Sequence, residues 1–141
     1  MKRMLAGVAA IVMLAAVGCS KPSTAPEPEP ARTSASAPVS NISAGDLLAK
    51  IKAGEKLLVV DVRTKDEFAQ GHVPGAQLVD LQTIEQGITK YAKDQELYLI
   101  CRSGNRSAQA YAILQGMGYT KLHNITGGMT EWEKLGGAME R

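Results

Sequence analysis

The sequence predicts an α/β domain with a central, mostly parallel sheet and helices on both faces. Three observations predict it. Short, continuous apolar runs, which are typical of buried parallel strands, alternate with stretches of helical period. Capping residues precede several of the helical stretches, and glycines follow some of them. The alternation fills residues 41–141, a length that suits one compact domain.

The first half of this region contains two helix starts with the spacing of a capping box. Ser43 with Asp46 opens one helix, and Thr64 with Glu67 opens the other. Gly54 ends the first helix. The elements predicted in this half are, in order, a helix at 44–52, a strand at 57–60, a short helix at 65–69, a turn at 71–75 and a weak strand at 77–79.

The second half continues the alternation of helix and strand. The predicted elements are a helix at 81–92, a strand at 96–100, a helix at 106–116, a strand at 121–125 and a helix at 129–135. Two of these helices have an apolar face that we expect to be buried. Its residues are Ile84, Ile88 and Tyr91 in the first helix, and Ala110, Ile113 and Leu114 in the second.

Residues 1–18 have the pattern of a lipoprotein-type signal peptide. A short charged segment, Lys2 and Arg3, precedes an apolar run from Met4 to Val17. That run is shorter than the roughly 20 residues that a membrane-spanning helix needs. Small residues then precede Cys19, as in the lipobox of bacterial lipoproteins, although Ala16 stands where Leu is commonest. We expect cleavage and lipidation at Cys19; plain secretion and an uncleaved anchor are the alternatives.

Residues 19–40 are expected to tether the domain to its lipid. Five of the six prolines lie here, among Ala, Ser, Thr and Glu. Such a composition cannot bury a core, so we predict a disordered linker with some polyproline II character. The protein would then belong to the cell envelope, with its domain in the periplasm. The absence of Asp after Cys19 favours the outer membrane over the inner one.

The charge of the mature chain is balanced. The chain has 16 basic and 14 acidic residues, and two of the basic ones, Lys2 and Arg3, lie in the predicted signal peptide. Without these two, 14 remain of each sign, which gives no general electrostatic attraction to nucleic acid. We therefore expect no nucleic-acid partner, and membrane attachment through the N-terminal lipid alone.

The segment best suited to chemistry is Cys-Arg-Ser-Gly-Asn-Arg-Ser, at 101–107. Cys101 directly follows the predicted strand 96–100 and so lies at the carboxyl edge of the sheet, where open parallel sheets bind their ligands. Gly104 and Asn105 tolerate the left-handed backbone that a tight loop requires. The amides of such a loop can converge on one anion.

The charges around this loop favour a thiolate over a thiol. Arg102 and Arg106 add two positive charges to the partial charge of about +0.5 at a helix start. In such surroundings the pKa of a cysteine falls below its usual value of about 8.5. The alternative, a buried structural cysteine, does not need Arg, Gly and Asn around it. The sequence therefore predicts a catalytic nucleophile at Cys101.

Cys101 is the only cysteine that remains once Cys19 carries lipid. It has no partner for an internal disulfide or a CxxC redox pair, so we expect a group carrier whose second substrate comes from outside. With His72 and His123 it gives no recognisable metal-ligand spacing, and we expect neither a metal nor another cofactor. Either histidine could serve as the base of a Cys–His dyad, but we interpret His72 mainly as a turn residue.

Together these motifs resemble the rhodanese family of sulfurtransferases. The resemblance covers nearly all of 41–141 and implies a single rhodanese-like domain of an exported bacterial thiosulfate sulfurtransferase. Asp61, Arg63, Glu67 and Trp132 are interpreted as structural residues. The landmarks occur in the family's order: Asp61-Val62-Arg63 with Glu67-Phe68, then Gly71-His72-Val73-Pro74-Gly75-Ala76, then the loop at 101–107, and finally Gly127-Gly128 with Trp132.

The resemblance implies a mechanism with two sulfur transfers. The Cys101 thiolate would take the outer sulfur of thiosulfate and release sulfite, leaving a persulfide. An acceptor thiol, or cyanide, would then remove that sulfur in a step that parallels thiol–disulfide exchange. We expect a monomer. The arginines would hold the sulfonate oxygens, and the substrate-binding residues would be those of the loop: Arg102, Ser103, Gly104, Asn105 and Arg106.

Loop length separates this chemistry from others on related folds. Four residues lie between Cys101 and Arg106. Related cysteine phosphatases and arsenate reductases have five, which gives a wider loop for a tetrahedral oxyanion. The shorter loop favours sulfur transfer over these enzymes. A non-catalytic role stays open, either as a sulfur carrier or as a docking module in the cell envelope.

Overall fold

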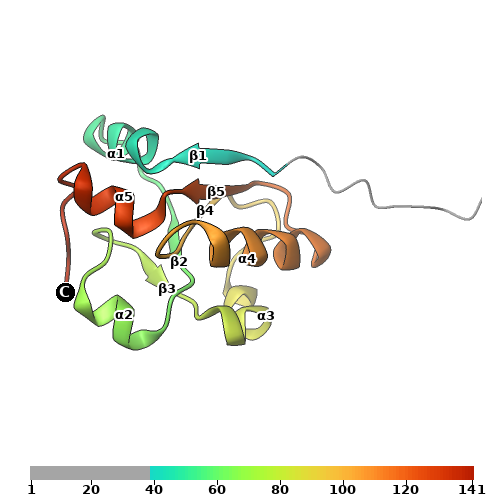
Figure 1. Ribbon diagram of the computed structural model, residues 1–141. Helices are drawn as coiled ribbons and strands as arrows, with labels where there is room; N and C mark the ends of the chain where they lie inside the picture. Colours follow the sequence, from blue (N-terminus) through green and yellow to red (C-terminus); the bar gives the residue numbers. More distant parts are fainter. Residues whose placement is uncertain (1–38) are drawn as a thin grey trace, which may run out of the picture. The chain divides into compact units, whose positions relative to one another are not determined.

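The computed structural model describes residues 39–141, which form a parallel α/β sheet structure (Figure 1). The predicted signal peptide, the lipidation at Cys19 and the linker up to residue 38 lie outside the described residues. The strands are β1 (Asn41–Ser43), β2 (Val59–Asp61), β3 (Gln77–Leu78), β4 (Leu97–Ile100) and β5 (Leu122–Thr126). They form one sheet in the order β1-β5-β4-β2-β3, and every pair of neighbours is parallel. The predicted fold class is confirmed.

The helices follow the strands along the chain. They are α1 (Ala44–Lys52), α2 (Lys65–Gln70), α3 (Ile84–Gly87), α4 (Asn105–Gly116) and α5 (Gly128–Lys134), with 3₁₀ turns η1 (Leu81–Thr83) and η2 (Ile88–Lys90) on either side of α3. None of the helices in this part of the chain is long and apolar enough to cross a membrane.

Two hydrophobic clusters show that helices cover both faces of the sheet. Along β4, successive side chains point to opposite faces. Leu97 and Leu99 belong to the cluster that contains α3 and α4 residues, whereas Tyr98 and Ile100 belong to the cluster of α1 and α5. All four residues of β4 are buried, as the continuous apolar run predicts. Cys101 continues the alternation on the α4 face.

The two predicted helix starts differ in detail. Thr64 and Glu67 form a complete capping box: each side chain bonds to the backbone N–H of the other residue. Ser43 caps α1 by accepting a bond from the N–H of Asp46, but the Asp46 carboxylate bonds only to the Ser43 hydroxyl. The aspartate side chain is one methylene shorter than glutamate, which explains why it does not reach back to the backbone.

The expected helix at 81–92 is wrong as a single element. It divides into η1, α3 and η2, because Thr83 leaves the helical region at φ −119°. Gly87 brings this segment close to the sheet edge, where a Cβ would lie 2.8 Å from a methyl carbon of Val79. The predicted inward side chains Ile84 and Ile88 are nevertheless buried.

Two further details differ from the sequence-based expectation. Strand β1 was not predicted, because Ile42 is its only apolar residue; it pairs with β5 at the edge of the sheet. In α4 the buried face consists of Ser107, Ala110, Tyr111 and Leu114, whereas Ile113 is only partly buried. The buried face therefore differs from the expected one in its rotation about the helix axis. It includes Ser107 in the first turn, and the hydroxyl of Ser107 lies beside the sulfur of Cys101.

Candidate active site

Cys101 lies at the carboxyl end of β4, the central strand of the sheet. Its side chain is 1% exposed and is not in a disulfide. The sulfur accepts a hydrogen bond from the N–H of Gly104 at 3.1 Å. The Ser107 hydroxyl lies 3.4 Å from the sulfur and 3.0 Å from the Gly104 carbonyl oxygen, so its single proton serves one of them at a time. The loop thus directs donors at the sulfur.

The surroundings of Cys101 favour its thiolate form. Burial raises the pKa of the thiol, but the hydroxyl of Ser107 and the amides of Ser107, Gly104 and Ser103 lower it further than burial raises it. The net pKa lies below the ordinary value of a cysteine. Neutral donors of the loop therefore do much of the activation that the sequence analysis assigned to the two arginines.

The backbone of α5 holds the first half of the loop. The carbonyl oxygens of Cys101 and Arg102 accept bonds from the N–H groups of Met129 at 2.8 Å and Thr130 at 3.0 Å. Gly128 makes this approach possible: a Cβ there would lie 2.7 Å from the Arg102 carbonyl oxygen and closer still to that of Cys101. With these carbonyls turned toward α5, the loop is held in its tight conformation.

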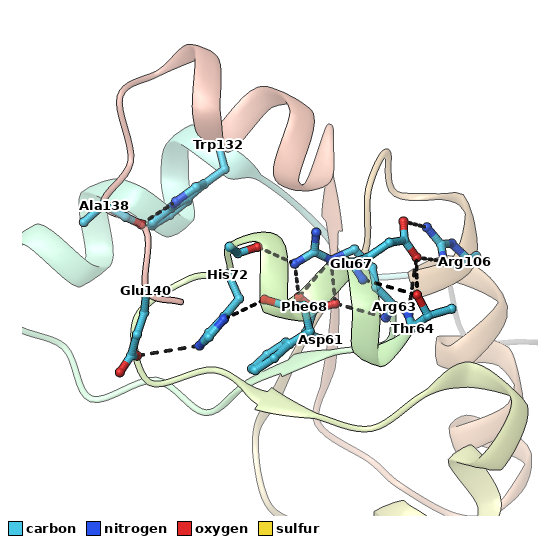
Figure 2. A network of polar contacts seen from close by, with 11 residues as sticks. Asp61, Arg63, Thr64, Glu67, Phe68, His72, Arg106, Trp132, Ala138 and Glu140 are labelled. Atoms are coloured by element: carbon cyan, nitrogen blue, oxygen red, sulfur yellow. Dashed lines mark hydrogen bonds and ion pairs between the residues drawn. The ribbon is translucent and has the colours of Figure 1, made fainter.

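The second half of the loop is held by a side chain of α2. Both guanidinium Nη atoms of Arg106 bond to the Glu67 carboxylate at 2.7 Å (Figure 2). Glu67 also closes the capping box with Thr64. The hydrogen bond from Arg106 is the main cause that lowers the pKa of Glu67 to about 2. The charge of Arg106 is therefore already compensated within the protein.

A buried ion pair lies beneath the site. The Arg63 guanidinium donates bonds to both oxygens of Asp61, with a shortest distance of 2.7 Å, and donates another bond to the Gly71 carbonyl at 2.8 Å (Figure 2). Buried charges of this kind need such complete pairing. The pair joins the end of β2 to the turn after α2, which agrees with the structural interpretation of Asp61 and Arg63.

A polar pocket of about 370 Å³ opens beside the loop. Cys101 is not among its lining residues, but the next residue in the chain, Arg102, is. One wall comes from Arg63 and α2, and the other from Arg102 and α5. The lining residues are Arg63, Glu67, Gln70, Arg102, Met129, Thr130 and Glu133.

Comparison with known proteins identifies the family. The rhodanese-like domain family matches residues 43–135, which include every element from the end of β1 to α5. The chain belongs to the rhodanese-like domain family. The resemblance inferred from the motifs is therefore confirmed at the level of the family.

Relatives of this rhodanese-like domain include named sulfurtransferases. A sulfurtransferase of Allochromatium vinosum is 36% identical over 98 residues, which cover 70% of this chain and 92% of that protein. A thiosulfate sulfurtransferase, GlpE, of Ectopseudomonas mendocina is 35% identical over 75 residues, which cover 53% of this chain and 69% of that protein. The sequence places the chain in a sulfurtransferase family.

Solved structures agree on the fold. A rhodanese-like domain protein from Staphylococcus aureus matches with a TM-score of 0.65 at 30% identity, over 73% of this chain and all of that one. A rhodanese-related protein from Thermoplasma volcanium matches with a TM-score of 0.63 at 28% identity, over 72% of this chain and 97% of that one.

The two histidines of the rhodanese-like domain have partners other than Cys101. The ring of His72 stacks on Phe68 with centroids 3.6 Å apart, and its Nδ1 bonds to the Phe68 carbonyl. The ring of His123 lies between the Ser40 hydroxyl and the Glu96 carboxylate. Within residues 39–141, neither histidine forms a dyad with Cys101, and the interpretation of His72 as a structural residue of the turn fits this geometry.

Sequence reasoning missed two residues that shape the site. Ser107 closes the motif at 101–107, yet it was not counted among the residues of the site; its hydroxyl lies against the sulfur. Gly128 served only as a family landmark, but it allows α5 to meet the loop. The signal for Ser107 was its place in the first turn of the predicted helix, below the convergent amides.

Proposed function

We propose that the protein is a thiosulfate sulfurtransferase that carries sulfur as a persulfide on Cys101. The observation that supports this best is the set of donors directed at the sulfur, with Gly104 N–H at 3.1 Å and the Ser107 hydroxyl at 3.4 Å, in a loop of four residues between Cys101 and Arg106. This set stabilises a sulfur anion without a metal or a histidine.

The first step forms one S–S bond and breaks another. The Cys101 thiolate attacks the outer sulfur of thiosulfate, and sulfite leaves with the electron pair of the bond that joined the two sulfurs. The Cys101 persulfide anion takes the place of the thiolate among the donors of the loop. Arg102 is exposed, lines the pocket and is the proposed ligand of the sulfonate oxygens.

The remaining loop residues take lesser roles in this proposal. Ser103 and Gly104 contribute backbone donors, and Asn105 begins α4. Arg106 is paired with Glu67, so its guanidinium acts on the substrate at longer range than Arg102. We propose that Arg106 holds the loop in shape and supplies a background of positive charge.

The second step returns the enzyme to its starting state. A thiolate acceptor, or cyanide, attacks the outer sulfur of the persulfide, and the Cys101 thiolate leaves. Because Cys101 is the only cysteine in residues 39–141, no resolving thiol of the described domain competes with the external acceptor. This supports a carrier that exchanges sulfur between two external substrates.

We propose further that this domain works in the periplasm, held to the membrane through lipidated Cys19. The support is the sequence pattern of residues 1–40: a charged start, an apolar run, a cysteine after small residues and a proline-rich segment. The outer membrane is favoured over the inner one by the same pattern. Metabolic labelling with a radioactive fatty acid, compared between wild type and Cys19→Ser, tests it; equal labelling would exclude lipidation at Cys19.

Intact-mass measurement tests the sulfur transfer most directly. The chain with Cys19→Ser, in which Cys101 is the only cysteine, should gain the mass of one sulfur atom on incubation with thiosulfate and lose it with cyanide. Adding Cys101→Ser should abolish both the mass gain and the steady-state formation of thiocyanate, a loss of at least about a thousandfold because the covalent route is gone.

Three outcomes separate the candidate functions. A folded protein that gains no sulfur excludes the proposed enzyme. A protein that gains sulfur but shows negligible turnover with cyanide and small thiols is a carrier or a docking module. Hydrolysis of a small aryl phosphate at a rate that depends on Cys101 would instead indicate the phosphatase chemistry that the short loop disfavours.

A further inference from the structure

The pocket beside the active-site loop contains four charged side chains, two of each sign. Arg63 and Arg102 are the cations, and Glu67 and Glu133 are the anions. They do not contribute equally to what a ligand meets, because a charge that is paired within the protein attracts a ligand less than a free one. The partners of each side chain therefore decide which ligand suits the pocket.

Two of the four charges are compensated inside the domain. Arg63 is paired with buried Asp61 at 2.7 Å. Both carboxylate oxygens of Glu67 accept bonds from Arg106 at 2.7 Å. Arg63 and Glu67 are the members of these pairs that line the α2 side of the pocket, and they present little net charge to it.

The other two charges are free to meet a ligand. Arg102 and Glu133 are both exposed, and within residues 39–141 neither has a hydrogen-bond or ion-pair partner for its side chain. Glu133 follows Met129 and Thr130 by four and three residues on α5, which places it on the same helical face. The backbone of Met129 and Thr130 in turn holds the carbonyls of Cys101 and Arg102. One cation and one anion thus lie on the same side of the site.

We propose that this pocket selects an acceptor thiol that carries an α-amino-acid group. Arg102 binds its carboxylate, Glu133 binds its ammonium, and the neutral side chains of Gln70 and Thr130 complete the polar lining. An acceptor with only one of the two charges leaves the other side chain unpaired and binds less well. A pocket of about 370 Å³ is large enough for an amino acid or a small peptide.

This inference rests on the proposed function, and it uses Arg102 twice in one cycle. In the first step Arg102 holds the sulfonate of thiosulfate, which leaves as sulfite. The vacated guanidinium then receives the carboxylate of the acceptor. The acceptor thiolate attacks the outer sulfur of the Cys101 persulfide, the S–S bond breaks, the Cys101 thiolate leaves, and the acceptor departs as its own persulfide. The step needs no oxidant or reductant.

A series of acceptors tests the selectivity. The chain with Cys19→Ser, loaded by thiosulfate, is assayed with cysteine, cysteamine, 3-mercaptopropionate and 2-mercaptoethanol at equal thiolate concentrations. Cysteine should have a KM about two- to fivefold lower than those of cysteamine and 3-mercaptopropionate, the effect of one partly exposed ion pair. Glutathione distinguishes the two sources of the amino-acid group: if it matches cysteine, its γ-glutamyl end suffices; if not, the group must be next to the thiol.

Glu133→Gln isolates the ammonium contact. It should raise the KM for cysteine and cysteamine about two- to fivefold, whereas it should neither raise the KM for 3-mercaptopropionate nor slow loading by thiosulfate, because those anions have no ammonium group for Glu133 to bind. Glu131→Gln is the matched control, since Glu131 lies on the same helix, pairs with Lys134 and does not line the pocket. Equal KM values across the series, or an equal loss with all acceptors in Glu133→Gln, would overturn the proposal.

A binding experiment keeps this inference separate from the proposed function. The double variant Cys101→Ser, Cys19→Ser cannot transfer sulfur but retains the pocket. Titration with S-methylcysteine, followed by backbone amide NMR, should shift signals of Arg102, Thr130 and Glu133, and 3-(methylthio)propionate should do so more weakly. Absence of these shifts contradicts the acceptor assignment even if sulfur transfer is found. Their presence without a sulfur adduct on wild-type Cys101 contradicts the proposed function and with it the acceptor role, and leaves only binding of the amino-acid group at the pocket.

Discussion

The loop that carries Cys101 is held by backbone on one side and by a side chain on the other. On the α5 side, carbonyls of the loop accept bonds from the N–H groups of Met129 and Thr130, and Gly128 leaves room for them. On the α2 side, the Glu67 carboxylate binds the guanidinium of Arg106. The two sides fix the same loop but depend on the sequence in different ways.

This difference assigns separate roles to the two arginines of the loop. The α5 side fixes the backbone of Arg102 and leaves its side chain free. On the α2 side, the positive charge of Arg106 is paired with the carboxylate of Glu67. A ligand that enters the pocket therefore meets the free arginine first. The spacing of the two arginines in the sequence does not reveal this asymmetry, because the partner of Arg106 lies 39 residues away.

The largest effect is expected from breaking the α5 side. Gly128→Ala places a Cβ against the carbonyls of Cys101 and Arg102 and strains a backbone at φ +53°. Because the contacted atoms are backbone, they cannot yield without moving the loop. We expect the free energy of unfolding to fall by about 3 kcal/mol. The rate of persulfide formation should fall on the order of a hundredfold, since the donors no longer converge.

Gly136→Ala controls for the strain alone. Gly136 has φ +69°, and a Cβ there would meet no atom within 4 Å. Urea unfolding should show a loss of about 1 kcal/mol, with persulfide formation unchanged. If the two alanine variants lost equal stability and equal rate, the close approach of α5 to the loop would not be what shapes the site.

A smaller, pH-dependent effect is expected from breaking the α2 side. The pKa of Glu67 falls from 4.5 to about 2 on folding, chiefly through its bond with Arg106. The pair therefore stabilises the fold fully above about pH 4.5, and that contribution is lost as pH falls toward 2. Glu67→Gln retains a capping residue and should lose about 1–2 kcal/mol at pH 7, after allowance for solvent screening.

The pH dependence of this stability loss shows whether the charge of Glu67 causes it. The difference in unfolding free energy between wild type and Glu67→Gln should shrink between pH 5 and pH 2, measured by urea unfolding at each pH. Glu55→Gln, which removes an exposed pair with Lys50, should show no resolvable change. A difference for Glu67→Gln that stays constant with pH would mean that packing, not charge, holds the α2 side.

Local patterns in the sequence were enough to place Cys101 at the end of a buried strand and to predict most of the elements. The apolar run of β4 ends one residue before Cys101, and Thr64 with Glu67 has the spacing of a capping box, so both signals are short-range. The divided helix at 81–90 was not predictable in the same way. Gly87 lies against Val79, a contact that only the folded chain makes, and no local pattern marks the break at Thr83.

The sequence did not predict how the Cys101 loop is held in place. The Glu67–Arg106 pair and the contact of Gly128 with Cys101 join residues that are 39 and 27 positions apart. No periodicity or spacing rule reports such pairings, because they depend on how the helices pack against the sheet. Motif resemblance pointed to these residues, and their physical roles came from the three-dimensional arrangement.

The smallest effect is expected from a change to the hydrogen-bond donors around the Cys101 sulfur, which both sides of the loop hold in place. Ser107→Ala removes the hydroxyl that, among the groups that lower it, contributes most to the lowered pKa of Cys101. The midpoint of the pH profile of persulfide formation should rise by about half a unit to one unit, the worth of one hydrogen bond. Ser43→Ala, which removes the hydroxyl that caps α1, should lower stability and leave the midpoint unchanged. If Ser107→Ala lowered the maximal rate without moving the midpoint, the hydroxyl would act on the Gly104 carbonyl and the shape of the loop rather than on the thiolate.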